Sequence, residues 1–142
     1  EQIYASMTLK VQTVNVQYIT QIWPMVEQFM VEAAKCSDDY SADQIKVYLT
    51  TGNWLLLVIV DEYNHVHGAI TLTFSNEANY RTAFITAIGG KNIVNDELFS
   101  EVQQILKSAG ATRIQAYAKD SAARLYEKIG LSKKATLMEI KL

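Results

Sequence analysis

Three strand-like segments follow one another in the middle of the chain, and they constrain the fold more than any other feature. Residues 54–60 are continuously apolar, which is typical of a strand buried on both faces. Residues 66–74 and 80–88 alternate instead, and polar turns separate all three segments. A run of strands joined by short turns predicts an antiparallel meander.

The third of these segments is predicted to be a regular strand. Strict alternation would place Ile85 and Ile88 on opposite faces of the sheet. The pattern stops at Gly89, because two adjacent glycines followed by polar residues are typical of a turn. We therefore expect Gly89 and Gly90 to lie in a loop between this strand and the next helix.

Helical periodicity appears on both sides of the meander, and three further short segments alternate as strands do. The predicted order is β-α-α-β-β-β-α-β-α-β. Such an order favours an α/β (α+β) domain with a mixed, mostly antiparallel sheet and helices on both faces. One domain would span residues 1–142. The predicted helices cover residues 19–33, 41–52, 94–109 and 120–130, and the other predicted strands cover residues 7–12, 113–118 and 134–142.

Local signals mark several helix ends. Ser41 and Gln44 are spaced as a capping box, and Gly52 is placed to end the helix that they begin. Either Asp120 or Ser121 is predicted to cap the last helix. Gly110 and Gly130 are likewise expected just beyond the ends of the last two helices.

Charge and cysteine content limit the classes of function. The chain has 13 basic and 15 acidic residues and a net charge of -2, so binding to nucleic acid through bulk positive charge is not expected. The longest apolar run, residues 54–60, is too short to cross a bilayer, so no membrane role is expected. The single cysteine, Cys36, excludes an intrachain disulfide, and a cytoplasmic protein without a signal peptide is predicted.

A dozen residues near the end of the chain carry a family resemblance. The segment Asp120-Ser-Ala-Ala-Arg-Leu-Tyr-Glu-Lys-Ile-Gly-Leu131 resembles the motif near the second CoA-contacting helix of the GNAT N-acetyltransferase superfamily. Leu131 stands where Phe is common, and Asp120 stands near where Asn is common. The element order also resembles that of the superfamily, over nearly the whole chain. The residues in register with the motif are Ala122, Leu125, Tyr126, Glu127 and Gly130.

The resemblance implies acetyl transfer from acetyl-CoA to a small-molecule or peptide amine, by direct attack of the amine. Tyr126 matches the family position that protonates the departing CoA thiolate. Backbone N–H groups near Ala87 would polarise the thioester carbonyl. The residues that the resemblance assigns to the CoA site are Ala87, Ile88, Gly89, Gly90, Lys91 and Asn92 after the meander, with Asp120 and Ser121 at the last helix.

The glycine segment departs from the family pattern. Members carry Gln/Arg-x-x-Gly-x-Gly/Ala where this chain has Ile-Gly-Gly-Lys-Asn-Ile-Val-Asn at residues 88–95, with other spacing and no Gln or Arg. Adjacent glycines can direct successive N–H groups at an anion, and Lys91 would add a positive charge. An ordinary strand-to-helix turn explains the same residues. The alternative function is therefore a catalytically inactive GNAT-fold protein with a binding, assembly or structural role, for example in a virus.

Other chemistry-bearing residues are scattered. Several turn residues could act as a general base, although a bound water could also serve. His65 and His67 lack the further ligands that a metal site needs, so no metal is expected. Acidic neighbours disfavour a Cys36 thiolate nucleophile. A homodimer could form through the last predicted strand if that strand lies at a sheet edge. The candidate bases are Asp61, Glu62, His65, His67 and Glu77, and Trp23, Phe29 and Met30 are either core or an acceptor pocket.

Overall fold

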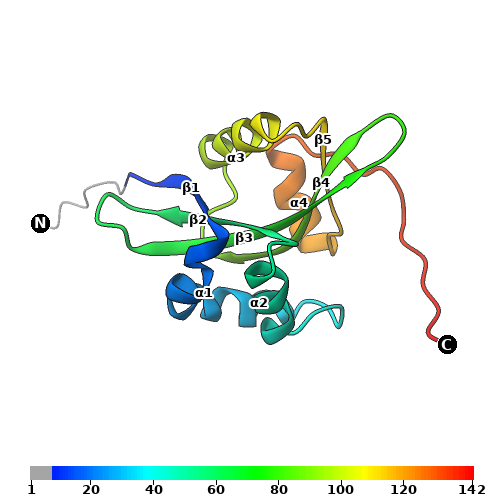
Figure 1. Ribbon diagram of the computed structural model, residues 1–142. Helices are drawn as coiled ribbons and strands as arrows, with labels where there is room; N and C mark the ends of the chain where they lie inside the picture. Colours follow the sequence, from blue (N-terminus) through cyan, green and yellow to red (C-terminus); the bar gives the residue numbers. More distant parts are fainter. Residues whose placement is uncertain (1–7) are drawn as a thin grey trace, which may run out of the picture.

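A five-stranded sheet in the order β1-β2-β3-β4-β5 lies between two helical layers in the computed structural model, which describes residues 8–142. Helices α1 and α2 cover one face of the sheet, and α3 and α4 cover the other (Figure 1). The strands are β1 (Lys10–Val14), β2 (Leu55–Val60), β3 (Val66–Asn76), β4 (Arg81–Gly90) and β5 (Arg113–Ala116), and the helices are α1 (Ile19–Ala34), α2 (Ala42–Thr50), α3 (Asp96–Ser108) and α4 (Asp120–Lys128).

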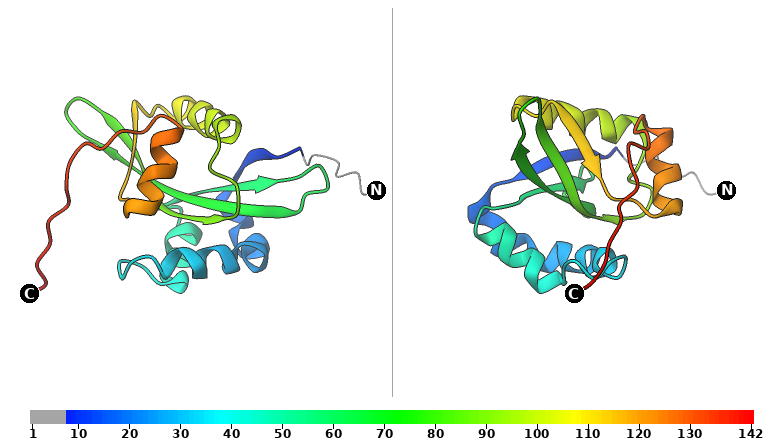
Figure 2. Two further views of the ribbon diagram at one scale, coloured as in Figure 1. Left: turned by 180° about the vertical axis from the view of Figure 1, so that it is seen from behind. Right: turned by 90° about the vertical axis from the view of Figure 1, so that its right-hand side faces the viewer.

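The pairing of the strands confirms the predicted mixed sheet. Strands β1 to β4 are antiparallel to their neighbours, whereas β5 runs parallel to β4. Parallel pairing requires a crossover, and α3 supplies it (Figure 2). Met7, which was included in the first predicted strand, lies outside the described residues.

Strand β2 is buried on both faces, as its apolar sequence predicted. Leu57 and Ile59 pack under α3, while Leu56, Val58 and Val60 pack against α1 and α2. The two core layers therefore meet at this strand, and its alternating side chains belong to one layer or the other.

Most of the predicted helix ends are confirmed. Ser41 and Gln44 form the reciprocal capping box, and Gly52, Gly110 and Gly130 have positive φ just beyond their helices. The prediction that Asp120 or Ser121 caps α4 is wrong. Lys119 is the N-cap residue because its backbone is already extended there, and no side chain caps this helix end. Among the described residues, no helix is both long and apolar enough to span a membrane.

The predicted strand at residues 134–142 is absent. This segment is extended but pairs with no described strand, and its side chains are exposed. An alternating sequence forms a strand only when a neighbouring edge supplies hydrogen bonds, and here the segment leaves the body of the domain (Figure 1).

Candidate functional site

A β-bulge interrupts β4 close to its middle. In the register with β3, Thr71 faces Ala87 and Leu72 faces Ile85, so Thr86 has no residue opposite it. Ile85 and Ile88 consequently both pack on the α3 face, and the prediction that they lie on opposite faces is wrong. The Thr71 and Thr86 hydroxyl oxygens are 2.7 Å apart and hydrogen-bonded at the bulge. Bulges bend a strand and are frequent next to active sites.

Strand β5 separates from β4 at this bulge. The parallel pairing joins Thr82 to Arg113 and ends where Ile85 faces Ala116, one residue before Thr86. From Ala87 to Gly90, β4 still pairs with β3, but from Thr86 to Gly90 its other edge has no partner strand in the described part of the chain. We call this free edge the β4–β5 opening. Its unpaired backbone groups can receive an extended ligand in the way that a sheet edge receives a strand.

Tyr126 of α4 lies behind the β4–β5 opening and is the one titratable residue among the described residues that line an apolar cavity there. The residue is 7% exposed, and it lines the cavity of about 20 Å³ together with Ile88 and Ile93. Burial, and to a smaller extent Cys36, raise the pKa of the Tyr126 phenol above its ordinary value. No described residue is hydrogen-bonded to its hydroxyl. The phenol is therefore protonated at neutral pH and free to donate to a ligand.

Gly89 and Gly90 belong to β4 and do not form a loop, which corrects the prediction. They pair with Ala69 and Gly68 of β3. A Cβ on Gly89 would lie 2.4 Å from the carbonyl oxygen of Phe29, because the backbone of α1 touches the sheet here. Gly90 has a φ of +128°, and a Cβ there would lie 2.6 Å from the carbonyl oxygen of His67 in β3. Packing alone thus requires glycine at both positions.

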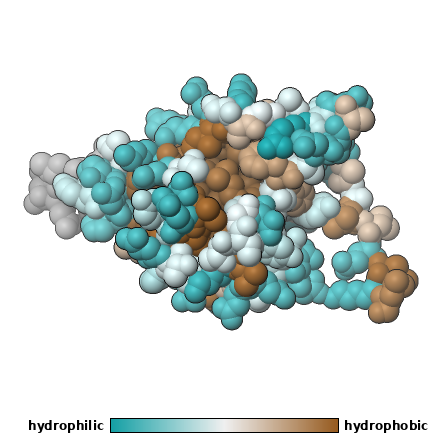
Figure 3. Space-filling model, in the orientation of Figure 1, coloured by the Kyte–Doolittle hydropathy of each residue, from teal (hydrophilic) through white to brown (hydrophobic). Residues whose placement is uncertain are grey.

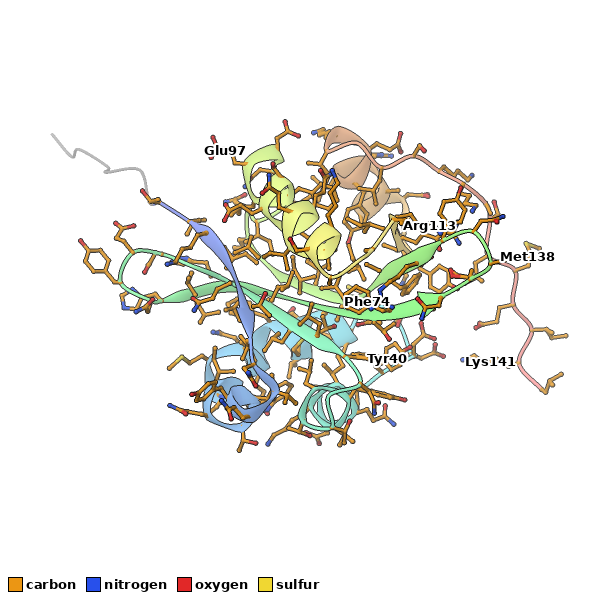
Figure 4. All side chains as sticks on the ribbon, turned by 45° about the horizontal axis from the view of Figure 1, so that its top comes forward. Tyr40, Phe74, Glu97, Arg113, Met138 and Lys141 are labelled. Atoms are coloured by element: carbon orange, nitrogen blue, oxygen red, sulfur yellow. The ribbon has the colours of Figure 1, made fainter. Side chains whose placement is uncertain are left out.

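The N-terminus of α3 is already capped and negatively charged. The Asn95 side chain accepts a hydrogen bond from the Leu98 N–H, and Asp96 and Glu97 occupy the first turn. Both carboxylates are exposed, and Glu97 lies on the outer side of the helix (Figure 4). Such charges stabilise a helix N-terminus but compete with a bound anion. Lys91, in the loop before α3, is exposed and is the positive charge nearest in sequence to this helix start.

The predicted CoA-site residues therefore fall into three places. Ala87 and Ile88 lie along the β4–β5 opening, Lys91 and Asn92 lie in the loop before α3, and Asp120 and Ser121 are exposed in the first turn of α4. Only Ile88 shares the apolar cavity with Tyr126. Sequence reasoning missed Ile93 and Val94, which line the same cavity. Ile93 and Val94 are two apolar residues between the polar Asn92 and Asn95, and this contrast could have identified them from the sequence.

Comparison with known proteins identifies this arrangement. No family model and no curated protein sequence matches the chain. Solved structures do match it: an aminoglycoside acetyltransferase from an uncultured soil metagenomic sample, in complex with sisomicin, is similar with a TM-score of 0.69 and 14% identity over 94% of this chain and 95% of that one. The chain has the GNAT fold.

Two further acetyltransferases support this statement. A possible acetyltransferase from Clostridium difficile 630 is similar with a TM-score of 0.68 and 12% identity, over 94% of this chain and 97% of that one. A Trypanosoma brucei acetyltransferase is similar with a TM-score of 0.60 and 11% identity, over 95% of this chain and 100% of that one. At such identities the likeness concerns the fold, and activity must be argued from the residues of this chain.

Asp61, one of the candidate bases in this GNAT fold, is committed to a structural role. Its carboxylate is 3% exposed and accepts hydrogen bonds from the backbone N–H groups of Tyr63 and His65. The His67 Nε2 lies 2.8 Å away and the His65 Nδ1 lies 3.2 Å away. These hydrogen bonds, that of His67 first, hold the pKa of Asp61 well below its ordinary value. The described part of the chain contains no group of three or more His, Cys, Asp or Glu side chains arranged to hold a metal ion.

Replacing Asp61 with Asn is expected to destabilise the β2–β3 turn. It should also reduce the loss of folding stability that occurs as the pH falls. The depressed pKa stabilises the fold above the unfolded value of about 4, and this contribution is lost as pH falls below that value. Thermal melts between pH 2 and 7 should show a smaller acid-induced decrease in Tm for Asp61→Asn than for the unaltered chain. Glu62→Gln, on the same turn, is the control. Equal pH dependence of both variants would contradict the role of Asp61.

The other candidates are also mostly structural. Glu77 binds the Thr82 hydroxyl at 2.5 Å and Arg113 at 3.2 Å, and these contacts lower its pKa, so it is a poor base. Trp23 and Met30 of α1 are buried in the core, and Phe29 of the same helix is partly buried against it.

Beside the loop between α1 and α2 lies an open depression of about 440 Å³. Its lining includes Val31, Lys35, Asp38, Tyr40 and Gln44.

Proposed function

We propose that this chain is an acetyltransferase that moves an acetyl group from acetyl-CoA to an amine. One observation carries the proposal: a buried, protonated phenol with no hydrogen-bonded residue, Tyr126, lies beside a strand whose edge a bulge has left unpaired. The phenol provides a proton donor, and the unpaired backbone provides hydrogen-bond donors. These are the two groups that cleavage of a thioester needs.

The proposed reaction uses both groups. The β4–β5 opening, from Thr86 to Gly90, holds the extended arm of the donor along its edge, since the cavity beneath has room for only about one water molecule. Backbone N–H groups there polarise the thioester carbonyl. The amine attacks the carbonyl carbon and forms the C–N bond, and the C–S bond then breaks. Tyr126 gives its proton to the departing thiolate and is reprotonated from solvent, while the amine loses its proton to water.

The acceptor amine is proposed to enter from the α1–α2 side. Asp38 and Tyr40 line the open depression there, and a carboxylate attracts a protonated amine. The acceptor amine would take the place of the Lys141 ammonium, which is paired with Asp38 in this structure.

The diphosphate of CoA fits this chain less well than does the extended arm of acetyl-CoA that lies along the β4–β5 opening. The N–H groups of residues 91–95 and the Lys91 ammonium would have to hold it, and the carboxylates of Asp96 and Glu97 oppose it. A second candidate function follows from this observation. The chain would then be a GNAT-fold protein with a binding, assembly or structural role and no acetyl transfer, and its glycines would serve packing alone.

Thermal stability with and without acetyl-CoA separates the two functions. A ligand at 100 times its dissociation constant adds about 2.7 kcal/mol, which raises Tm by several degrees. Under the proposed function, the combined substitution Asp96→Asn and Glu97→Gln should enlarge the shift, and Lys91→Ala should reduce it. Glu32→Gln on α1 is the control and should change nothing. No shift at millimolar acetyl-CoA, even with the acidic turn neutralised, would favour the second candidate.

A further inference from the structure

The segment after α4 leaves the body of the domain and returns a charge to the α1–α2 side. Residues 132–142, which we call the tail, form no strand or helix and are exposed. Figure 3 shows the apolar end of the tail standing clear of the body. The Lys141 ammonium is nevertheless paired with the Asp38 carboxylate in the loop between α1 and α2. Figure 4 places Lys141 on the same side of the molecule as Tyr40, which with Asp38 lines the open depression.

The other polar side chains of this depression are engaged by their own helices. The Lys35 ammonium is paired with Glu32 of α1 at 2.9 Å. Ser41 and Gln44 bind each other's backbone N–H groups in the capping box of α2. Among the described residues of the lining, Asp38 is thus the charged group that takes its partner from a distant part of the chain. The ligand that suits the depression therefore carries a positive charge.

The remaining lining is apolar and suits an alkyl stem. Val31, Ala34 and Ala42 line the depression with the Tyr40 ring, and Val31 is 41% exposed. An ammonium group on an unbranched alkyl chain can place its stem along such a surface while its charged end stays in water. A lysine side chain has this form, and the group paired with Asp38 is the end of a lysine side chain.

We propose that the depression is a binding site for a primary ammonium group on an unbranched alkyl chain, and that Lys141 is its internal occupant. An acceptor amine must then displace the tail before it reaches Asp38. The inference rests on the proposed function, because it names the chemical class of the acceptor and the contact that regulates its entry. Binding of the amine can still be measured without acetyl transfer.

The tail is expected to compete only moderately. The side chains of Lys141 and Asp38 are 70% and 65% exposed, so water and salt screen their attraction. The covalent link keeps Lys141 close to Asp38 at every protein concentration. An exposed pair of this kind should weaken the apparent affinity for a competing amine about 2- to 6-fold. The tail would thus shield the depression from weak ligands and yield to tighter ones.

Binding of small amines to the full chain tests the proposal. The probes are Nα-acetyl-lysine amide, which represents a lysine of a polypeptide, and putrescine, which represents a free polyamine. Titration followed by the backbone amide signals of residues 38–44 gives both affinities, and the tighter probe identifies the source of the amine. Lys141→Gln should bind the probes about 2- to 6-fold more tightly than the unaltered chain, and added salt should reduce this difference.

Two further variants complete the binding test. Lys133→Gln removes the same charge from an exposed position of the tail and should leave the affinity unchanged. Asp38→Asn should abolish binding of both probes. In the unaltered chain, either probe should also increase the mobility of residues 140–142, measured by ¹⁵N relaxation, because the amine releases Lys141.

Four outcomes would overturn the proposal. Failure of both probes to bind Lys141→Gln shows that the depression does not take alkyl amines. Equal affinities of Lys141→Gln and the unaltered chain show that the tail does not compete. An equal gain in Lys133→Gln attributes the effect to total charge, and binding that survives Asp38→Asn places the site elsewhere.

The transfer assay separates this inference from the proposed function. With the tighter probe as acceptor, Lys141→Gln should lower KM about 2- to 6-fold. Amine binding that follows the expected pattern without any acetyl transfer would reject the transferase and retain the ammonium site. Acetyl transfer with the same KM in both chains would retain the transferase and reject the role of Lys141.

Discussion

Tyr126→Phe is expected to lower kcat for acetyl transfer about 100-fold, at the lower end of the usual range for a general acid. The substitution removes only the hydroxyl, and the phenyl ring should still fill the apolar cavity beside Ile88. The leaving thiolate would then have to take its proton from water. The shift in Tm produced by acetyl-CoA should stay unchanged, because the ring and the β4–β5 opening are intact. Steady-state kinetics and the thermal melt together separate a catalytic role from a binding role.

A matched control uses Tyr63, which is 75% exposed in the β2–β3 turn. Tyr63→Phe removes a hydroxyl of the same kind at a distance from Tyr126 in the sequence, and it should leave kcat unchanged. If Tyr126→Phe were as active as the unaltered chain, the phenol would not be the acid. The mechanism would then need a water as its donor, and Tyr126 would serve packing alone.

Gly89→Ala is expected to destabilise the fold by about 3 kcal/mol and to lower Tm by about 10 °C. The added Cβ would lie 2.4 Å from the Phe29 carbonyl oxygen, which is backbone and cannot rotate away as a side chain can. Either α1 must move off the sheet or β4 must shift in its register with β3. Both changes would disturb the β4–β5 opening.

Gly130→Ala separates this steric effect from backbone strain. Gly130 has a φ of +107°, and a Cβ there would meet no atom within 4 Å. Only the conformational cost remains, and it should be about 1 kcal/mol. Chemical denaturation of both variants gives the two free energies of unfolding. If Gly89→Ala were no more harmful than Gly130→Ala, close packing would not explain Gly89. A ligand-binding role for this glycine would then be the better explanation.

These two substitutions address different halves of the same question. The Gly89→Ala substitution tests whether Gly89 is needed for packing, as the second candidate function requires. The Tyr126→Phe substitution tests whether the phenol donates a proton in acetyl transfer, as the transferase requires. A chain could satisfy both conditions, because packing at Gly89 and a proton donor at Tyr126 involve different faces of β4.

The sequence by itself determined the order of the helices and strands from β1 to α4, and most of their ends, but it wrongly added a last strand. Periodicity of two or of three to four residues identified the meander and all four helices, because each pattern records which face of one element is buried. The capping box at Ser41 and the glycine at Gly52 act within one helical turn, so a single sequence was enough to place them. The motif resemblance selected Tyr126, and the structure places it at a cavity wall.

Only the tertiary structure decided how closely the elements approach and which edges remain free. The bulge at Thr86 depends on the register between β3 and β4, and the need for Gly89 depends on Phe29, which is distant in the sequence. The tail has a strand sequence without a strand, since hydrogen bonds to a partner edge are needed to form one. Local patterns report the surroundings of one element, whereas contact distances and strand pairing are properties of two elements packed together.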